Sequence, residues 1–221
     1  VVDGEGRLVG IITADDVMDV IQQENTEDME RMAAMAPSEK PYLKTSPFAL
    51  AKKRIVWLLV LMISATFTGG IINGFQEVLS SVVVLAAFIP MLMDTGGNCG
   101  SQSSTLVIRG LALGEIRPRD ALRVLNKELA VSLLCGAALA AVNFGRILLF
   151  EPQTGAAVAL AVSLSLLVTV MVSKCLGGLL PIAAKAVHLD PAVMASPLIT
   201  TVVDAVSLLV YFGFARAILG I

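Results

Sequence analysis

One carboxylate, Asp204, lies at the centre of a long apolar stretch near the C-terminus. Seven uncharged residues flank it on each side, so no Lys or Arg neighbours it on the same helix. An ionised carboxylate at the centre of a bilayer costs about 2.5–3.5 kcal/mol, and such a residue normally faces a cavity or a partner. The sequence therefore predicts an ion site at Asp204. A protonated or interhelically paired structural carboxylate is the alternative.

Hydroxyl side chains accompany Asp204 at helical spacing. Ser196, Thr200 and Ser207 fall on the same predicted helix face as Asp204. Oxygen ligands suit hard cations such as Mg²⁺ or Ca²⁺. One carboxylate is too few for a cage made only of protein, which favours Mg²⁺ held through its hydration shell. A symmetric pair of chains would double the charge.

A second polar cluster lies in residues 90–110, PMLMDTGGNCGSQSSTLVIRG. Pro90 and the run from Gly96 to Gly100 predict a break in the helix. Broken helices at membrane depth are common at transporter ion sites, because their freed backbone groups can line a cavity. Asp94 and Asn98 are four residues apart in this segment. The alternative is a close-packed bend with polar groups hydrogen-bonded between helices.

The elements that would position these residues are apolar and long. The chain is 56% hydrophobic and 15% charged, with a mean hydropathy of +0.83. The first 54 residues hold 17 of the 34 charged side chains, so the remainder is predicted to be membrane-embedded. A membrane-spanning helix needs about 20 apolar residues. Five candidates meet this requirement: Ile55–Asn73, Val78–Gly96, Leu125–Phe150, Gly155–Ala186 and Val193–Ile221.

The N-terminal residues have a different pattern. Asp3-Gly4 predicts a tight turn, residues 8–13 a strand, and Asp15-Asp16 the start of an amphipathic helix. A unit this small cannot bury a core, and the chain starts without Met, so we expect a piece of a longer protein. The acidic run that follows is usually a solvated helix face. Against another acidic surface it would repel, and divalent cations could then screen it.

Several classes of function have no support in the sequence. A net charge of −2 gives no case for nucleic-acid binding. Three cysteines without a CxxC motif indicate neither a disulfide framework nor a zinc site. The sequence contains no nucleotide-binding loop and no Ser-His-Asp set. We therefore expect no enzymatic activity.

Two segments together resemble the MgtE family of magnesium transporters. They are GGNCGSQSSTLVIRGLALGEI within residues 90–116 and DPAVMASPLITTVVDAVSLLVYF at residues 190–212. The stretch VVDGEGRLVGIITADDVMDVI resembles the closing segment of a CBS domain, which this family carries before its membrane part. The resemblance runs in order along nearly the whole chain.

The resemblance implies a fold and an organisation. The fold would be an all-α polytopic membrane protein with five transmembrane helices per subunit, preceded by a β-α fragment of a CBS domain and a connecting helix. Residues 1–24 would end the CBS domain, residues 25–54 would form the plug helix and linker, and residues 55–221 would form the pore domain. The resemblance also implies a homodimer with its pore on the two-fold axis.

The resemblance also implies roles for particular residues. Asp204 matches the pore carboxylate that holds hydrated Mg²⁺, and Asn98 matches a pore-lining residue. Asp190 matches an Asp at the inner mouth. Asp16 and Glu24 match acidic positions that bind regulatory Mg²⁺. Ser196 stands where some members have Asn.

These observations predict a passive channel that conducts hydrated Mg²⁺ down its electrochemical gradient in a cell membrane. In the full-length protein, cytoplasmic Mg²⁺ would gate it. Basic residues precede the first span (Lys52, Lys53 and Arg54), and further basic residues follow the second. The positive-inside rule then places the N-terminus in the cytoplasm and the C-terminus outside. A non-conducting membrane metal sensor or scaffold is one alternative. Another CBS-linked channel is the second, although the buried charge here is acidic, which disfavours an anion channel.

Overall fold

The computed structural model describes residues 1–38 and 41–220, apart from the side chain of Ser196. Helices account for its regular structure, and no strand occurs within these described ranges. In chain order the elements are α1 (Ala14–Met32), η1 (Tyr42–Lys44), α2 (Pro47–Gly74), α3 (Gln76–Ser81), η2 (Val83–Phe88), α4 (Ile89–Ala112), η3 (Pro118–Asp120), α5 (Ala121–Phe150), η4 (Pro152–Thr154), α6 (Ala156–Ala186), η5 (Pro191–Met194) and α7 (Ser196–Leu219).

Five helical segments in the described part are long and apolar enough to cross a membrane. They are Pro47–Gly74, Val83–Ala112, Pro118–Phe150, Ala156–Ala186 and Pro191–Leu219. The predicted all-α fold with five spans is therefore confirmed. The second span begins at Val83 and not at Val78, since the separate helix α3 (Gln76–Ser81) precedes it. It ends at Ala112 and not at Gly96, because α4 continues through the glycine run.

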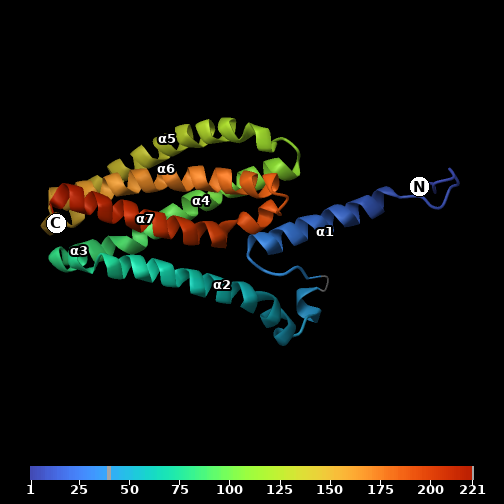
Figure 1. Cartoon of the computed structure of the whole chain (residues 1–221), viewed down its shortest axis with the longest axis horizontal. Coiled ribbons are helices and arrows are strands. Elements are labelled where there is room, and N and C mark those ends of the chain that lie inside the picture. The colour runs from blue at the N-terminus through green and yellow to red at the C-terminus, as the bar shows by residue number, and fades with distance from the viewer. Residues whose placement is uncertain (39–40, 221) are drawn as a thin grey trace.

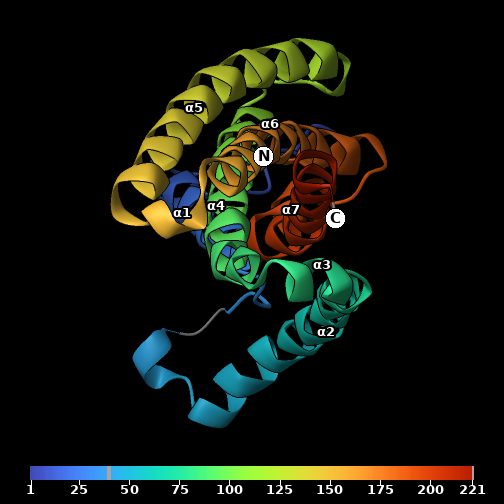
Figure 2. The same ribbon diagram turned by 90° about the vertical axis from the view of Figure 1, so that its left-hand side faces the viewer.

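The spans α4, α5, α6 and α7 form one bundle, and α2 stands to its side (Figures 1 and 2). More than half of the apolar window of α6 is buried inside the protein, whereas only 6% of that of α2 is buried. Near its C-terminal end α2 meets α7, where the Phe75 and Phe212 rings stack with centroids 4.5 Å apart. A helix that is apolar all round and unburied faces lipid or another protein surface.

Helix boundaries follow local chemistry. Thr13 caps α1 in a reciprocal capping box with Asp16, as the acidic start predicted. Ser46 caps α2, whose first residue is Pro47. Gly220 ends α7 in the left-handed conformation that glycine adopts without strain.

The glycine run does not break α4, and the prediction of a broken helix there was wrong. The helix is continuous from Ile89 to Ala112. A Cβ added at Gly97 would lie 2.9 Å from Thr200 Cγ2 of α7, and one added at Gly100 would lie 2.7 Å from Ile199 Cγ2. Pro90 is near the start of α4, where its missing N–H costs no hydrogen bond. The glycines therefore allow α4 to pack closely against its neighbours.

The N-terminal segment extends away from the bundle (Figure 1). The predicted strand at residues 8–13 is wrong: Val2 and Leu8 form one isolated bridge, and no strand follows. Residues 1–26 are all exposed, so no surface supports a strand there. Helix α1 runs unbroken from Ala14 to Met32, across the boundary expected between residues 1–24 and the segment 25–54.

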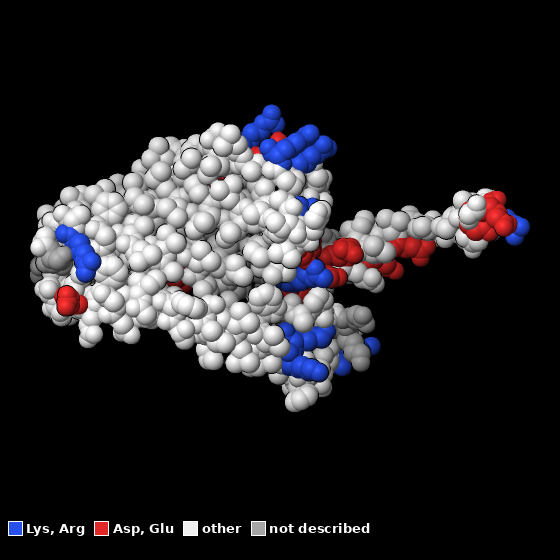
Figure 3. All heavy atoms as spheres, viewed as in Figure 1, with Lys and Arg blue, Asp and Glu red and all other residues white. Residues whose placement is uncertain are grey.

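Basic side chains gather at the end of the bundle that carries α1 (Figure 3). We call this the α1 end, and the opposite one the far end. The α1 end includes Lys52 and Arg54 near the start of α2, Arg119 in η3 and Arg123 at the start of α5. Arg216 lies near the last turn of α7, with its guanidinium 4.8 Å from the Phe75 ring centre.

Candidate ion site

An open groove of about 480 Å³ lies between α4 and α7. It brings together most of the polar residues that the sequence predicted along the ion path. Its lining consists of Ile89, Pro90, Met93, Asp94, Gly97, Asn98, Thr200 and Asp204. Two helices more than 80 residues apart in sequence therefore form one site.

The α4 side contributes a carboxylate and an amide. Asn98 Nδ2 donates a hydrogen bond to Asp94 Oδ2 at 3.1 Å, and both residues are exposed in the single chain. Residues four apart share a helix face. The close approach of Gly97 to Thr200 places this face directly beside α7. The four-residue spacing of Asp94 and Asn98 thus places both side chains on one helix face, although the helix is unbroken.

The α7 side contributes a hydroxyl and a half-buried carboxylate. Thr200 Oγ1 donates to the Pro197 carbonyl oxygen at 2.9 Å, which leaves its lone pairs free to accept from a ligand in the groove. Asp204 lies one turn further along. Ser207 is buried, and a Cβ added at Gly96 would lie 3.0 Å from its Oγ, so this hydroxyl faces the helix junction instead. The Ser196 side chain is outside the described part of the chain.

The groove offers oxygen ligands of the kind that hard cations prefer. Within the described residues, no three His, Cys, Asp or Glu side chains converge on one point that could hold a metal ion. A single chain therefore provides too few carboxylates for an all-protein cage. The groove can instead accept hydrogen bonds from the water shell of a cation, and its open side leaves room for more ligands.

A separate group of charges joins α1 to η5 at the α1 end. Asp190 accepts from the backbone N–H of Ala192 at 2.9 Å and forms an ion pair with Arg31 of α1. Arg31 also pairs with Glu27, one turn earlier. The hydrogen bond to Asp190 raises the pKa of Arg31. Asp190 thus lies outside the groove, and its carboxylate is already paired with the guanidinium of Arg31. The sequence did not reveal this ion pair.

Asp28 is the neighbouring acid on α1. Burial raises the pKa of its carboxyl, and the negative charge of Asp190 raises it further. The docked end of α1 therefore holds acidic groups close together, with Arg31 as their shared counter-charge.

Asp16 and Glu24 also lie on α1 and are not part of the groove lining. Hydrogen bonds from the side chain and backbone of Thr13 lower the pKa of Asp16, which acts as the capping partner of the helix. Glu24 is exposed. The structure does not bring these two residues together with Asp204.

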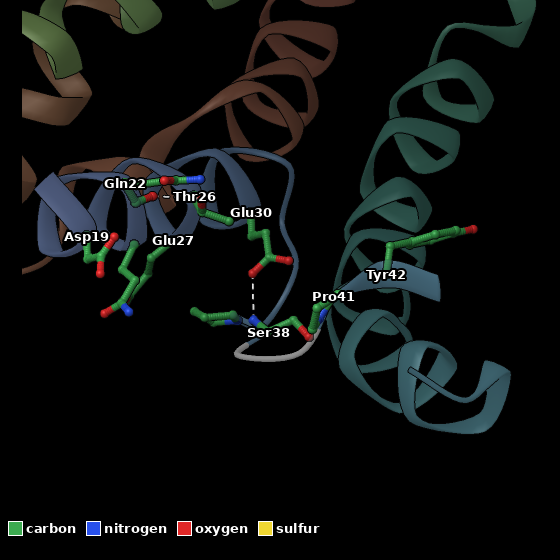
Figure 4. A pocket seen from close by; sticks show the side chains of 10 residues that line it. Asp19, Gln22, Thr26, Glu27, Glu30, Ser38, Pro41 and Tyr42 are labelled. Carbon is green, nitrogen blue, oxygen red and sulfur yellow. Dashed lines mark hydrogen bonds between the residues drawn. The ribbon is translucent and has the colours of Figure 1, made fainter. Parts of the chain in front are cut away.

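A second, larger cavity of about 970 Å³ separates α1 from the linker that follows it (Figure 4). Three acids of α1 line it: Asp19, Glu27 and Glu30. Glu30 Oε2 accepts from the backbone N–H of Ser38 at 2.6 Å and so ties the linker to the helix. The remaining lining residues are Gln22, Gln23, Thr26, Pro37, Ser38, Pro41 and Tyr42.

Lys174 and Glu128 are charged residues within the spans that were not predicted as site residues. Lys174 of α6 is only 5% exposed, and Glu128 of α5 accepts a hydrogen bond from Ser103 of α4. Both lie inside predicted apolar spans, and that position was the signal that could have identified them.

Comparisons with known proteins place this fold. The model of the family described as "MgtE: Divalent cation transporter" matches residues 89–214, from α4 into α7. A magnesium transporter MgtE of Thermus thermophilus is 40% identical over 99% of this chain and 48% of its own length. One of Bacillus subtilis is 36% identical over 98% of this chain and 47% of its own. One of Enterococcus faecalis is 30% identical, with 97% and 46% covered.

The chain thus spans about half the length of the curated relatives it matches. The family model covers more than half of the chain and includes both helices that line the groove. The chain therefore belongs to the MgtE family, whose members are transporters and not enzymes.

Proposed function

We propose that this chain is the membrane part of a channel that conducts hydrated Mg²⁺ down its electrochemical gradient. The observation that carries the proposal is the groove between α4 and α7, where Asp94 and Asp204 face a common space within the spans. Two carboxylates at membrane depth are expensive unless they face a cavity, a partner or an ion. The three relatives are magnesium transporters by name, which supports Mg²⁺ as the substrate.

The ligand chemistry favours an ion that keeps its water. Mg²⁺ dehydrates reluctantly and is usually bound through few carboxylates and several waters. Asp204, Thr200 and Asn98 supply one carboxylate, one hydroxyl and one amide oxygen, all suited to accept hydrogen bonds from that water shell. In this proposal Asp204 provides the charge that attracts Mg²⁺, while Thr200 and Asn98 line its path.

Two copies of the chain would complete the path. The groove is open along one side, and α2 leaves most of its apolar surface unburied. A two-fold dimer that joins the grooves would place four carboxylates around one axis. These four would supply the negative charge for a divalent cation that the carboxylates of one chain are too few to provide. The bilayer would cover the remaining apolar surface.

The driving force needs no nucleotide. Each elementary charge gains about 2.3 kcal/mol per 100 mV of membrane potential, so a divalent cation gains roughly 4.6 kcal/mol. The basic α1 end would face the cytoplasm by the positive-inside rule, and the C-terminus would lie outside. Mg²⁺ would then enter toward the negative side.

The segment before α2 would regulate the path. Residues 1–24 would complete a CBS domain in the longer protein, and residues 25–54 would link it to the pore. High cytoplasmic Mg²⁺ would screen the acidic side of α1, with Asp16 and Glu24 among its ligands. It would thereby hold this helix against the mouth at Asp190.

The test is Mg²⁺ entry into proteoliposomes under an inside-negative potential, with wild type beside Asp204→Asn. Glu115→Gln is the control, because Glu115 is an exposed carboxylate outside the groove. We expect entry in wild type and Glu115→Gln and loss of entry in Asp204→Asn. Equal entry in all three would place the ion path elsewhere. Absence of entry in folded wild type would contradict a passive channel and favour a metal sensor or scaffold.

A further inference from the structure

A buried ammonium contacts the helix that lines the groove. Lys174 of α6 is 5% exposed, and its Nζ donates to Gln102 Oε1 of α4 at 3.4 Å. A charged side chain inside a membrane protein requires a partner or a function. Lys174 does not line the groove, so its charge is not part of the proposed ion path.

An opposite charge contacts the next residue of α4 from another helix. Glu128 of α5 accepts a hydrogen bond from Ser103 Oγ at 2.6 Å, and Ser103 is almost fully buried. Glu128 also packs on Gly178, one turn after Lys174 on α6: a Cβ added there would lie 3.0 Å from Glu128 Cγ. A cation and an anion from two helices therefore hold consecutive residues of α4.

The position of these contacts ties them to the groove. Gln102 follows Asn98 by four residues and Asp94 by eight, so a rotation of α4 at Gln102 also turns the polar face in the groove. The glycine contacts of α4 set how closely it approaches α6, but glycine has no side chain to resist rotation or sliding. Hydrogen bonds to charged groups in a low-dielectric interior are strong and directional. Ser103 and Gln102 thus supply the orientation that the glycines cannot.

We propose that Lys174 and Glu128 form a two-point clamp on α4, which fixes the rotation of this helix and so positions Asp94 and Asn98 in the groove. Both are positioning residues and do not touch the ion. Lys174 is buried and Glu128 is partly buried, and each holds α4 through a hydrogen bond to one of two adjacent residues. Once one contact is weakened and α4 can turn, weakening the other should cost little more. The two substitutions should therefore be strongly non-additive. The transport part of this proposal rests on the proposed function, and the stability part does not.

The first experiment is a double-mutant cycle on the whole chain in detergent, read by thermal unfolding. Lys174→Met and Glu128→Gln keep the shape of each side chain and remove its charge. We expect each single variant to unfold at a lower temperature. The ratio of folded to unfolded protein in the double variant should be at least about tenfold higher than the sum of the two single effects predicts. Arg7→Gln with Glu5→Gln is the control, because both side chains of that ion pair are exposed. Its single and double variants should stay near wild type. Additive effects of Lys174→Met and Glu128→Gln would overturn the clamp.

The second experiment measures Mg²⁺ entry per folded protein across a range of Mg²⁺ concentrations. A displaced α4 should raise the half-saturating concentration several-fold in each single variant, and the double variant should raise it little further. A purely structural role would lower the maximal rate with the amount of folded protein and leave half-saturation unchanged, which would overturn the positioning role. If folded wild type carries no Mg²⁺, the proposed function fails, and the unfolding cycle still decides whether the clamp exists.

Discussion

The contact between Gly177 of α6 and Gly100 of α4 gives a sharp test of how the glycine run works. A Cβ added at Gly177 would collide with the Gly100 carbonyl oxygen and lie 2.9 Å from its carbonyl carbon. The obstacle is backbone, so no side chain can rotate aside. We expect Gly177→Ala to push α4 away from α6.

The size of the effect follows from this geometry. Ordinary carbon contacts begin near 3.4 Å, so the two helices must separate by at least about 0.5 Å at this crossing. Overpacking of a tight interior typically costs about 1–3 kcal/mol, and a backbone obstacle places this site at the upper end. At about 2–4 °C per kcal/mol for a chain of this size, the melting temperature should fall by roughly 6–12 °C.

The assay is thermal unfolding in detergent, with Mg²⁺ entry into proteoliposomes as a second readout. Gly145→Ala in α5 is the matched control, because a Cβ there meets nothing within 4 Å. Its stability should stay within about 0.5 kcal/mol of wild type. An unchanged melting temperature in Gly177→Ala would refute the close crossing of α4 and α6. An equal loss in both variants would show that any helical glycine is sensitive.

Three further predictions concern the two ends of the bundle. Arg31→Gln removes the ion pair to Asp190, so α1 should dock less firmly and Mg²⁺ entry at high internal Mg²⁺ should rise; unchanged entry would contradict a gating role for this contact. The pKa of Asp28 lies above its ordinary value of 3.8 in the folded chain, so docking of α1 should be strongest below that value and weaken as the pH rises through the raised pKa. Asp28→Asn should remove this dependence and lower entry at neutral pH, and a pH profile identical to wild type would count against it. At the far end, Tyr211→Phe removes the hydrogen bond to the Leu85 carbonyl at 2.9 Å. The free energy of unfolding should fall by about 1–3 kcal/mol in a thermal unfolding assay, because that buried carbonyl is left unsatisfied. A fall below about 0.5 kcal/mol would show that the bond does not hold η2.

Much of the groove could be predicted from residue types and spacing. Asp204 stood out because a carboxylate with seven uncharged neighbours on each side must face a cavity or a partner in a membrane. Thr200 followed from helical periodicity, and Asn98 from its spacing to Asp94. The structure places all four along one groove. Their roles in ion conduction remain predictions.

The prediction from local sequence pattern was wrong at the glycine run, because glycine can either break a helix or let two helices pack closely. Gly96, Gly97 and Gly100 lower helix propensity, which indicated a break, yet each meets a neighbouring helix closely enough to exclude a side chain. Tertiary packing outweighs the propensity cost of about 1 kcal/mol per glycine. The strand at residues 8–13 failed for the converse reason, because an isolated β-rich segment without a packed face is not stable.

The sequence by itself determined that the chain has five apolar spans and that a few carboxylates lie inside them. Span length and the energetic cost of buried charge are local properties, so they can be read from one residue and its neighbours. Only the tertiary structure decided that α4 stays helical, that Arg31 forms an ion pair with Asp190, and that Lys174 and Glu128 contact adjacent residues of α4. These features depend on contacts between helices far apart in sequence. The neighbouring helix decides whether a glycine breaks its own helix or lets two helices pack closely, and whether a charged side chain finds a hydrogen-bond partner.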